Sequence, residues 1–121
     1  MSDLITGEII GAAIEVHKTL GHGLLESIYE KALCHELELR GIKFQREVEF
    51  DITYKDKVIE SEKINLVVQD EVAVEIISRI KSPNAATSII VSYLTAVGLQ
   101  RGMVFDFAAR RLIDGVKRIV I

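Results

Sequence analysis

The sequence has little of what small secreted proteins use to hold a fold together. It contains one cysteine, one proline and no tryptophan in 121 residues. The single cysteine, Cys34, cannot form an internal disulfide bond, so the fold must depend on a hydrophobic core. Cys34 lies in a stretch of helical pattern, and we interpret it as a small buried apolar residue. A reactive thiol is the alternative.

Long apolar runs and an excess of positive charge are also missing. No apolar run approaches the roughly 20 residues that span a bilayer, and the N-terminus lacks the pattern of a signal peptide. We therefore expect no membrane association and a cytoplasmic location. The net charge of −3 argues against binding nucleic acid through broad electrostatics. The net charge does not exclude an enzyme that binds the phosphate of its substrate through divalent metal ions.

The composition that remains is that of a globular protein, with 49% hydrophobic and 27% charged residues. Residues 1–121 are expected to form a single domain. Apolar residues at helical spacing predict helices from Ser2 or Asp3 to Leu20, from Leu25 to Arg40, and from Ala85 to Val97. Alternating patterns predict strands over Lys43–Thr53, within Lys63–Arg79, over Met103–Phe107 and over Val116–Ile121. Val58 and Ile59 are assigned to a connection.

The segment Lys63–Arg79 organises this pattern, because it is interpreted as two apolar strands joined by a tight turn. If Val68 lies opposite Val72, the register places Asn65 opposite Glu75. A carboxylate within such an apolar strand is costly unless it is paired, hydrogen-bonded or bound to metal. Glu75 is therefore the first candidate site residue.

The order of predicted elements is helix, helix, three strands, helix, two strands (ααβββαββ), which indicates an α/β sandwich with a mixed sheet flanked by helices. The Met103 strand follows a helical crossover and is expected to run parallel to the Ala73 strand. The helix–three strands–helix–strand core within this order resembles the plan of the PD-(D/E)XK nuclease-like superfamily.

Three segments of the sequence resemble one particular family within this superfamily. Gly23 to Tyr29, GLLESIY, resembles the motif that names the GxxExxY family, which is classed with the PD-(D/E)XK nucleases. The segments IIGAAIEVHKTLGHG and LIDGVKRIVI are similar to the same family and occur in the same order. The resemblance covers nearly the whole chain.

The resemblance implies where a metal-dependent site would lie. In the superfamily an Asp on one strand and a Glu-x-Lys on the next hold Mg²⁺ and assist the attack on phosphate. Here the Asp position is Asn65, the Glu position is Glu75 and the Lys position is Ile77. Glu26 and Tyr93 are retained, Ile89 replaces a glutamine, Asp106 replaces an asparagine and Lys63 replaces an arginine. Glu26 has a second interpretation, favourable contact with the dipole of its helix.

These departures predict a degraded site in a protein that acts without catalysis, with no cofactor. Two alternatives stay open. One is a divergent Mg²⁺- or Mn²⁺-dependent nuclease. It would use Glu75 and Asp106 to hold metal, together with Glu26, and Arg79 or Lys63 as the cation. The other is a nucleic-acid-binding module that does not cleave and uses the basic residues of the C-terminal third, Arg101, Arg110, Arg111, Lys117 and Arg118. A nucleic acid and a second copy of the chain are the partners left open.

Overall fold

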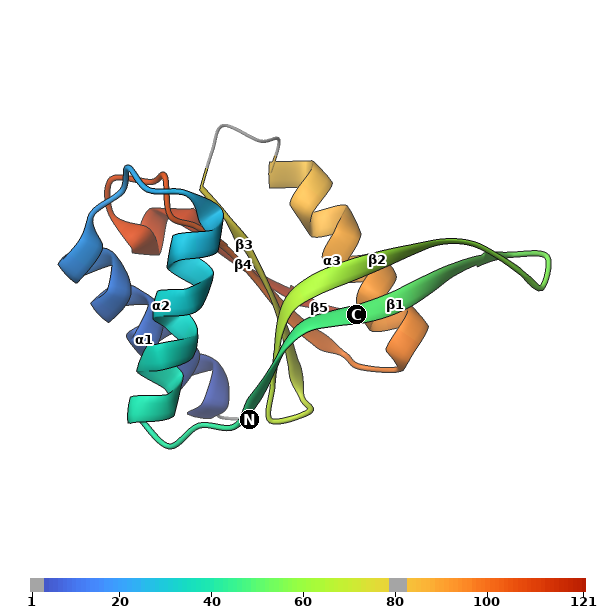
Figure 1. Cartoon of the computed structure of the whole chain (residues 1–121), viewed down its shortest axis with the longest axis horizontal. Helices are drawn as coiled ribbons and strands as arrows, with labels where there is room; N and C mark the ends of the chain where they lie inside the picture. The colour runs from blue at the N-terminus through green and yellow to red at the C-terminus, as the bar shows by residue number, and fades with distance from the viewer. Residues whose placement is uncertain (1–3, 79–82) are drawn as a thin grey trace.

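Helices on two sides enclose a mixed sheet in the computed structural model, which describes residues 4–78 and 83–121 (Figure 1). The elements are α1 (Leu4–Leu20), α2 (Glu26–Leu39), β1 (Phe44–Tyr54), β2 (Lys57–Val68), β3 (Val72–Ile77), α3 (Pro83–Val97), β4 (Arg101–Asp106), the 3₁₀ helix η1 (Leu112–Gly115) and β5 (Val116–Val120). This order confirms the predicted α/β architecture. The 3₁₀ helix was not predicted.

The five strands lie in the order in which they occur in the chain, β1-β2-β3-β4-β5. Neighbouring strands are antiparallel except β3 and β4, which are parallel. The parallel pair requires a crossover, and α3 provides it. The prediction that the Met103 strand runs parallel to the Ala73 strand is therefore confirmed.

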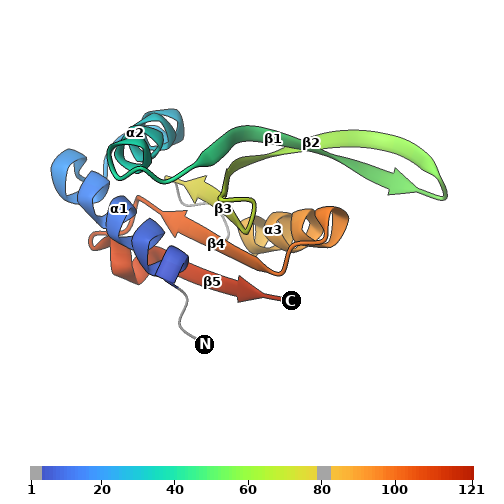
Figure 2. The same cartoon turned by 90° about the horizontal axis from the view of Figure 1, so that it is seen from below.

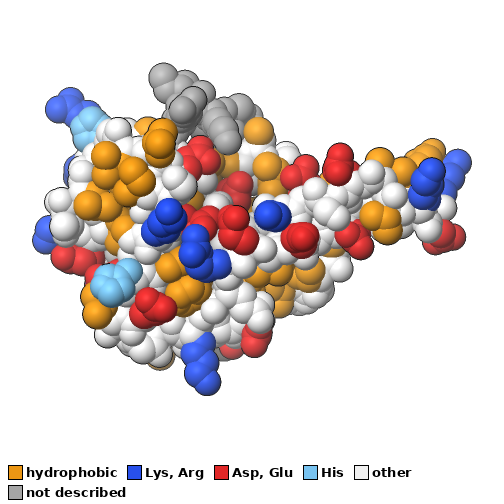
Figure 3. Space-filling view, in the orientation of Figure 1, with side chains coloured by type: hydrophobic (Ala, Val, Ile, Leu, Met, Phe, Trp, Pro, Cys, Tyr) orange, Lys and Arg blue, Asp and Glu red, His pale blue; other side chains and the backbone are white. Residues whose placement is uncertain are grey.

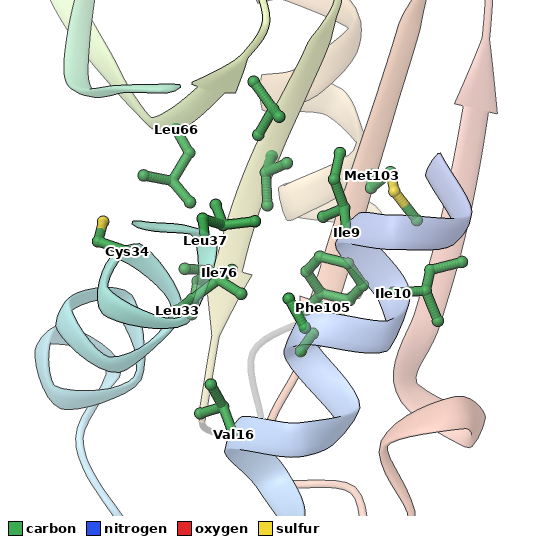
Figure 4. Packing of buried hydrophobic residues seen from close by; sticks show 14 of the residues in the cluster. Ile9, Ile10, Val16, Leu33, Cys34, Leu37, Leu66, Ile76, Met103 and Phe105 are labelled. Carbon is green, nitrogen blue, oxygen red and sulfur yellow. The ribbon is translucent and has the colours of Figure 1, made fainter. Parts of the chain in front are cut away.

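Each side of the sheet has its own hydrophobic core. Under α1 and α2 the core includes Ile9, Leu33, Ile76 and Phe105, which Figure 4 shows between the two helices and the strands. Under α3 it includes Ala73, Ile77, Ile90 and Val104. Figure 2 shows α1 and α2 at one end of the molecule, α3 near its middle and the β1–β2 hairpin at the other end. Since successive residues of β3 and β4 face opposite cores, both strands carry buried apolar residues on both faces.

The β1–β2 hairpin is longer than predicted and runs out beyond the rest of the molecule (Figures 1 and 2). The assignment of Val58 and Ile59 to a connection is wrong, because β2 already begins at Lys57. Lys55 and Asp56 form the turn with φ of 49° and 68°, the backbone of a two-residue hairpin turn. The register shifts once, between Ile52 and Thr53.

The ends of the helices agree with the predicted ones to within one or two residues where they can be compared. Gly41, with φ of 70°, follows the end of α2 as expected of a terminating glycine. The predicted caps Ser2 and Asp3 lie outside the described residues. None of the helices in the described ranges is long and apolar enough to cross a membrane.

Candidate functional site

A buried carboxylate on α2 is the centre of a polar cluster against the sheet. The Glu30 side chain is only 7% exposed. Its Oε2 accepts hydrogen bonds from Arg46 Nη2 at 2.7 Å and Arg46 Nε at 3.3 Å, and its Oε1 accepts one from Asn65 Nδ2 at 2.5 Å. Burial of a charge is tolerated when it is both paired and hydrogen-bonded. We call these three residues the Glu30 cluster.

Asn65 connects the Glu30 cluster to the end of the β2–β3 ladder. The last paired residues of that ladder are Leu66 and Val74. Beyond them the backbone N–H of Ile76 donates to Asn65 Oδ1 at 2.8 Å, so the side-chain amide replaces a strand carbonyl. The predicted register, with Val68 opposite Val72, is confirmed, but the ladder ends before Asn65 and Glu75, so their pairing stays a prediction.

A local kink in β1 and β2 explains how Asn65 reaches α2. Glu47 has φ of 52°, and the register between β1 and β2 skips Glu47 and Asn65. Ile64 packs in the core under α3, whereas Leu66 packs in the core under α1 and α2. On a regular strand these two residues would share a face. The kink therefore turns the Asn65 side chain towards Glu30.

Tyr29, the tyrosine of the GLLESIY segment, fixes the connection between α1 and α2. It is fully buried. Its hydroxyl donates to the Gly21 carbonyl at 2.5 Å and accepts from the Leu24 N–H at 3.1 Å. Its ring stacks on Phe107 with centroids 4.4 Å apart. The tyrosine thus has a structural role in the described contacts.

Glu26 lies in the first turn of α2, one turn before Glu30 and on the same side of the helix. It is half-buried. The hydroxyl of Ser78, directly after β3, donates to the Leu24 carbonyl at 2.6 Å. The end of β3 therefore lies against the start of α2, and Glu26 is close to where these elements meet.

Two predicted site positions are part of the hydrophobic core. Ile77, at the lysine position, is 2% exposed in the core under α3. Tyr93 is 3% exposed and packs edge-to-face on Phe50 with centroids 5.0 Å apart. Burial, with a smaller effect of Asp70, raises the pKa of the Tyr93 hydroxyl. Neither residue presents an ionised group where the superfamily has its lysine.

Glu75 and Asp106 lie on the adjacent parallel strands β3 and β4, where Asp106 is level with Ile77. Glu75 is half-buried. Asp106 Oδ1 accepts the Ala108 N–H at 2.9 Å and so stabilises the turn after β4. Arg79, the predicted substitute cation, is outside the described residues, and Lys63 is exposed.

The described residues do not fit an Mg²⁺ or Mn²⁺ ion. Such ions need several oxygen ligands, and in residues 4–78 and 83–121 no three Asp, Glu, His or Cys side chains are grouped to hold one. The carbonyl oxygen of Asn65 is engaged by the Ile76 N–H. We derive no metal-dependent step.

The sequence interpretation missed Glu30 and Arg46. Glu30 is a charged residue on a helix that the sequence predicts, yet it is only 5% exposed. A signal was present, because Arg46 occurs in the apolar row of the strand with Phe44 and Val48. A cation in such a row is expected to pair with a carboxylate.

A pocket of about 410 Å³ lies between the end of α1 and η1. Its wall and rim carry four side chains with basic groups, Lys18, His22, Arg110 and Arg111, around the apolar Ile14, Leu112 and Ile113. The buried His17 also lines the pocket, and its Nε2 atom lies 2.8 Å from the Ala109 carbonyl oxygen. Asp114 pairs with Arg111 at 3.1 Å. This cationic pocket is the densest positive region that the described pockets contain.

Comparison with known families places the chain in one of them. The sequence matches the PD-(D/E)XK nuclease superfamily over residues 3–119. The chain belongs to this superfamily, in agreement with its sheet order and flanking helices. Searches of curated proteins and of solved structures gave no significant match.

Proposed function

We propose that this chain is a non-catalytic member of the PD-(D/E)XK nuclease superfamily, of the GxxExxY type, which acts by binding. The Glu30 cluster is the observation that supports this most directly. At the position of the superfamily's Asp, Asn65 directs an N–H donor at a buried carboxylate at 2.5 Å. An amide held in this way is a poor ligand for a hard dication.

Ile77, which stands at the lysine position of the superfamily's Glu-x-Lys motif, supports the same proposal. A lysine there would steady negative charge on the attacked phosphate. The isoleucine instead completes the core under α3, where it is 2% exposed. A missing group of this kind commonly costs several orders of magnitude in rate.

Calorimetric titration with Mg²⁺ and Mn²⁺, together with cleavage assays on single- and double-stranded DNA and RNA, tests the proposal. We expect no saturable binding up to millimolar metal and no cleavage. Cleavage that depends on metal and is lost in Glu75→Gln would instead support a divergent nuclease. Cleavage equal in both proteins would indicate a contaminant.

A second candidate function is binding of phosphate groups of nucleic acid at the cationic pocket. The four basic side chains around a concave apolar floor support it, since such a site offers charge to phosphate and a surface to a base. Fluorescence anisotropy with labelled single-stranded DNA should show affinity that falls steeply with salt and drops in Lys18→Ala/Arg110→Ala.

The matched control is Lys117→Ala/Arg118→Ala, which removes the same charge from exposed positions on β5. It should bind as the unaltered protein does. Equal loss in both variants would mean that only overall charge matters, and a flat salt response would reject the binding site.

A further inference from the structure

The outer part of the β1–β2 hairpin is exposed along its whole length and faces α3 only at its base. Every residue from 51 to 62 is exposed, and β3 pairs with β2 only at residues 66–68. We call residues 51–62 the arm. Figures 1 and 2 show it extending past α3. An isolated two-stranded ribbon is marginally stable in water, so its apolar residues indicate that something covers it.

The arm has an inner face that continues the core under α3. Phe50, Ile52 and Tyr54 alternate along β1, and their exposed fractions rise from 6% to 40% to 64% towards the tip. Phe50 packs on Tyr93 of α3, which fixes this face as the one turned to α3. The apolar row thus begins inside the core and ends uncovered at the tip.

A groove of about 530 Å³ runs between this face and α3. Its walls are residues 50–53 of the arm and its base, and Val91, Ser92, Thr95 and Ala96 of α3. Val91 is 37% exposed. The groove is therefore open to an apolar side chain from outside.

The charges on the inner face are sorted along the arm. Lys57 is opposite Tyr54 at the tip, whereas Glu60 and Glu62 are opposite Ile52 and Phe50 at the stem. Figure 3 shows acidic side chains along the stem, and basic side chains together with an acidic one at the far end. If the inner faces of two copies pack against each other in antiparallel orientation, Lys57 of each copy lies next to Glu60 and Glu62 of the other copy.

The sign of the charge also selects the partner. Residues 51–62 contain four carboxylates, Asp51, Asp56, Glu60 and Glu62, and two lysines. A net negative ribbon repels the phosphates of nucleic acid. A face that is complementary to itself fits a second copy of the same chain about a two-fold axis.

We propose that two copies of this protein associate through their arms, each tip lying in the groove of its partner. Tyr54 fills the groove between Ile52 and Val91 of the partner subunit, and Lys57 pairs with Glu60 or Glu62 of the partner subunit. Aromatic anchors in a pocket supply most of the affinity of such interfaces, and the charge pairs fix the orientation.

Sedimentation equilibrium over a range of protein concentrations tests the association. We expect a concentration-dependent dimer. Tyr54→Ser, Lys57→Glu and Glu60→Lys should each raise the dimer dissociation constant at least tenfold, with unchanged circular dichroism. Mixing Lys57→Glu with Glu60→Lys should restore dimers, because each altered side chain then meets an opposite charge.

Glu49→Lys is the matched control, because Glu49 lies on β1 with its side chain on the opposite face from Phe50. It should leave the dimer unchanged. A monomer at all concentrations would overturn the proposal. So would a dimer that the Tyr54 and Lys57 variants do not weaken, or a mixture that forms no more dimer than its components.

Discussion

At the scale of single residues, the amide of Asn65 matters because it combines a donor and an acceptor. The Asn65 carbonyl oxygen accepts a hydrogen bond from the Ile76 N–H, and the Asn65 amide nitrogen donates one to the Glu30 carboxylate. An aspartate would accept the same backbone N–H but would set a second carboxylate against Glu30. The amide thus makes the approach of strand and helix favourable where the acid would oppose it.

Asn65→Asp is therefore expected to destabilise the protein at pH 7 by about 2–4 kcal/mol, since it places an unpaired charge against one that is already buried. Urea unfolding in EDTA measures the effect.

The double variant Asn65→Asp/Glu30→Gln is the control, because the new amide donates to the new carboxylate. It should recover at least half of the lost stability. If Asn65→Asp in EDTA is as stable as the unaltered protein, the contact with Glu30 has no energetic weight. A gain in stability on adding Mg²⁺ to Asn65→Asp would mean that position 65 alone limits metal binding.

At the scale of elements, the kink in β1 and β2 positions the candidate site. A residue other than glycine in the left-handed region costs roughly 1–2 kcal/mol, and Glu47 occupies it with φ of 52°. Opposite Glu47 in the hairpin, the Asn65 side chain points towards α2, and the neighbouring Ile64 side chain points towards α3. The strained residue and the redirected side chain are parts of one irregularity.

Substitution of Glu47 tests whether this backbone conformation is imposed. Glu47→Gly should raise the free energy of unfolding by up to about 1 kcal/mol, because glycine adopts positive φ without strain. Glu47→Val should lower it by about 1–2 kcal/mol, since a branched residue resists that region. Thermal or urea unfolding measures both.

Glu49, two residues further along β1, gives the opposite expectation. In regular strand geometry Glu49→Gly should destabilise and Glu49→Val should be tolerated. The same order of stabilities at positions 47 and 49 would contradict a special conformation at Glu47.

The elements were predictable where local pattern decides them, and less so where tertiary contacts do. The alternating pattern of apolar residues correctly predicted the β3 strand and the pairing of Val68 with Val72. A shift of the register by one residue would have buried a charged side chain. The length of β2 was missed, since Val58, Ile59 and their neighbours lack an apolar face. A strand without a core gives no alternating signal.

The positions of the candidate site stay a prediction from the resemblance, and the contacts around Asn65 were not predicted. The positions of Asn65 and Ile77 follow from the resemblance. Glu30 was missed because the partner that justifies its burial, Arg46, comes from a strand 16 residues away. The kink at Glu47 has no signal in the sequence, since glutamate has no preference for positive φ.

At the scale of the whole molecule, a central sheet separates two cores, and the thiol of Cys34 lies in the one under α1 and α2. Burial is the largest cause that raises the pKa of Cys34, from 9.0 to about 11. Arg46 lowers it in part, whereas Glu30 and Glu38 add to the rise. Cys34 is a neutral core residue at physiological pH.

This buried thiol predicts how global stability depends on alkaline pH. Between pH 9 and 11 the unfolded chain has lost the Cys34 proton while the folded protein keeps it. Since the unfolded state binds fewer protons there, stability falls as pH rises, by roughly 2–3 kcal/mol in total from this group. Below pH 9 the contribution is flat.

Denaturant unfolding at a series of pH values, compared with Cys34→Ala, isolates the effect because the tyrosines and lysines titrate in both proteins. The variant should be less stable at pH 7, from the lost packing, but its stability should fall less steeply above pH 9. Parallel curves would show that the folded core does not hold this proton.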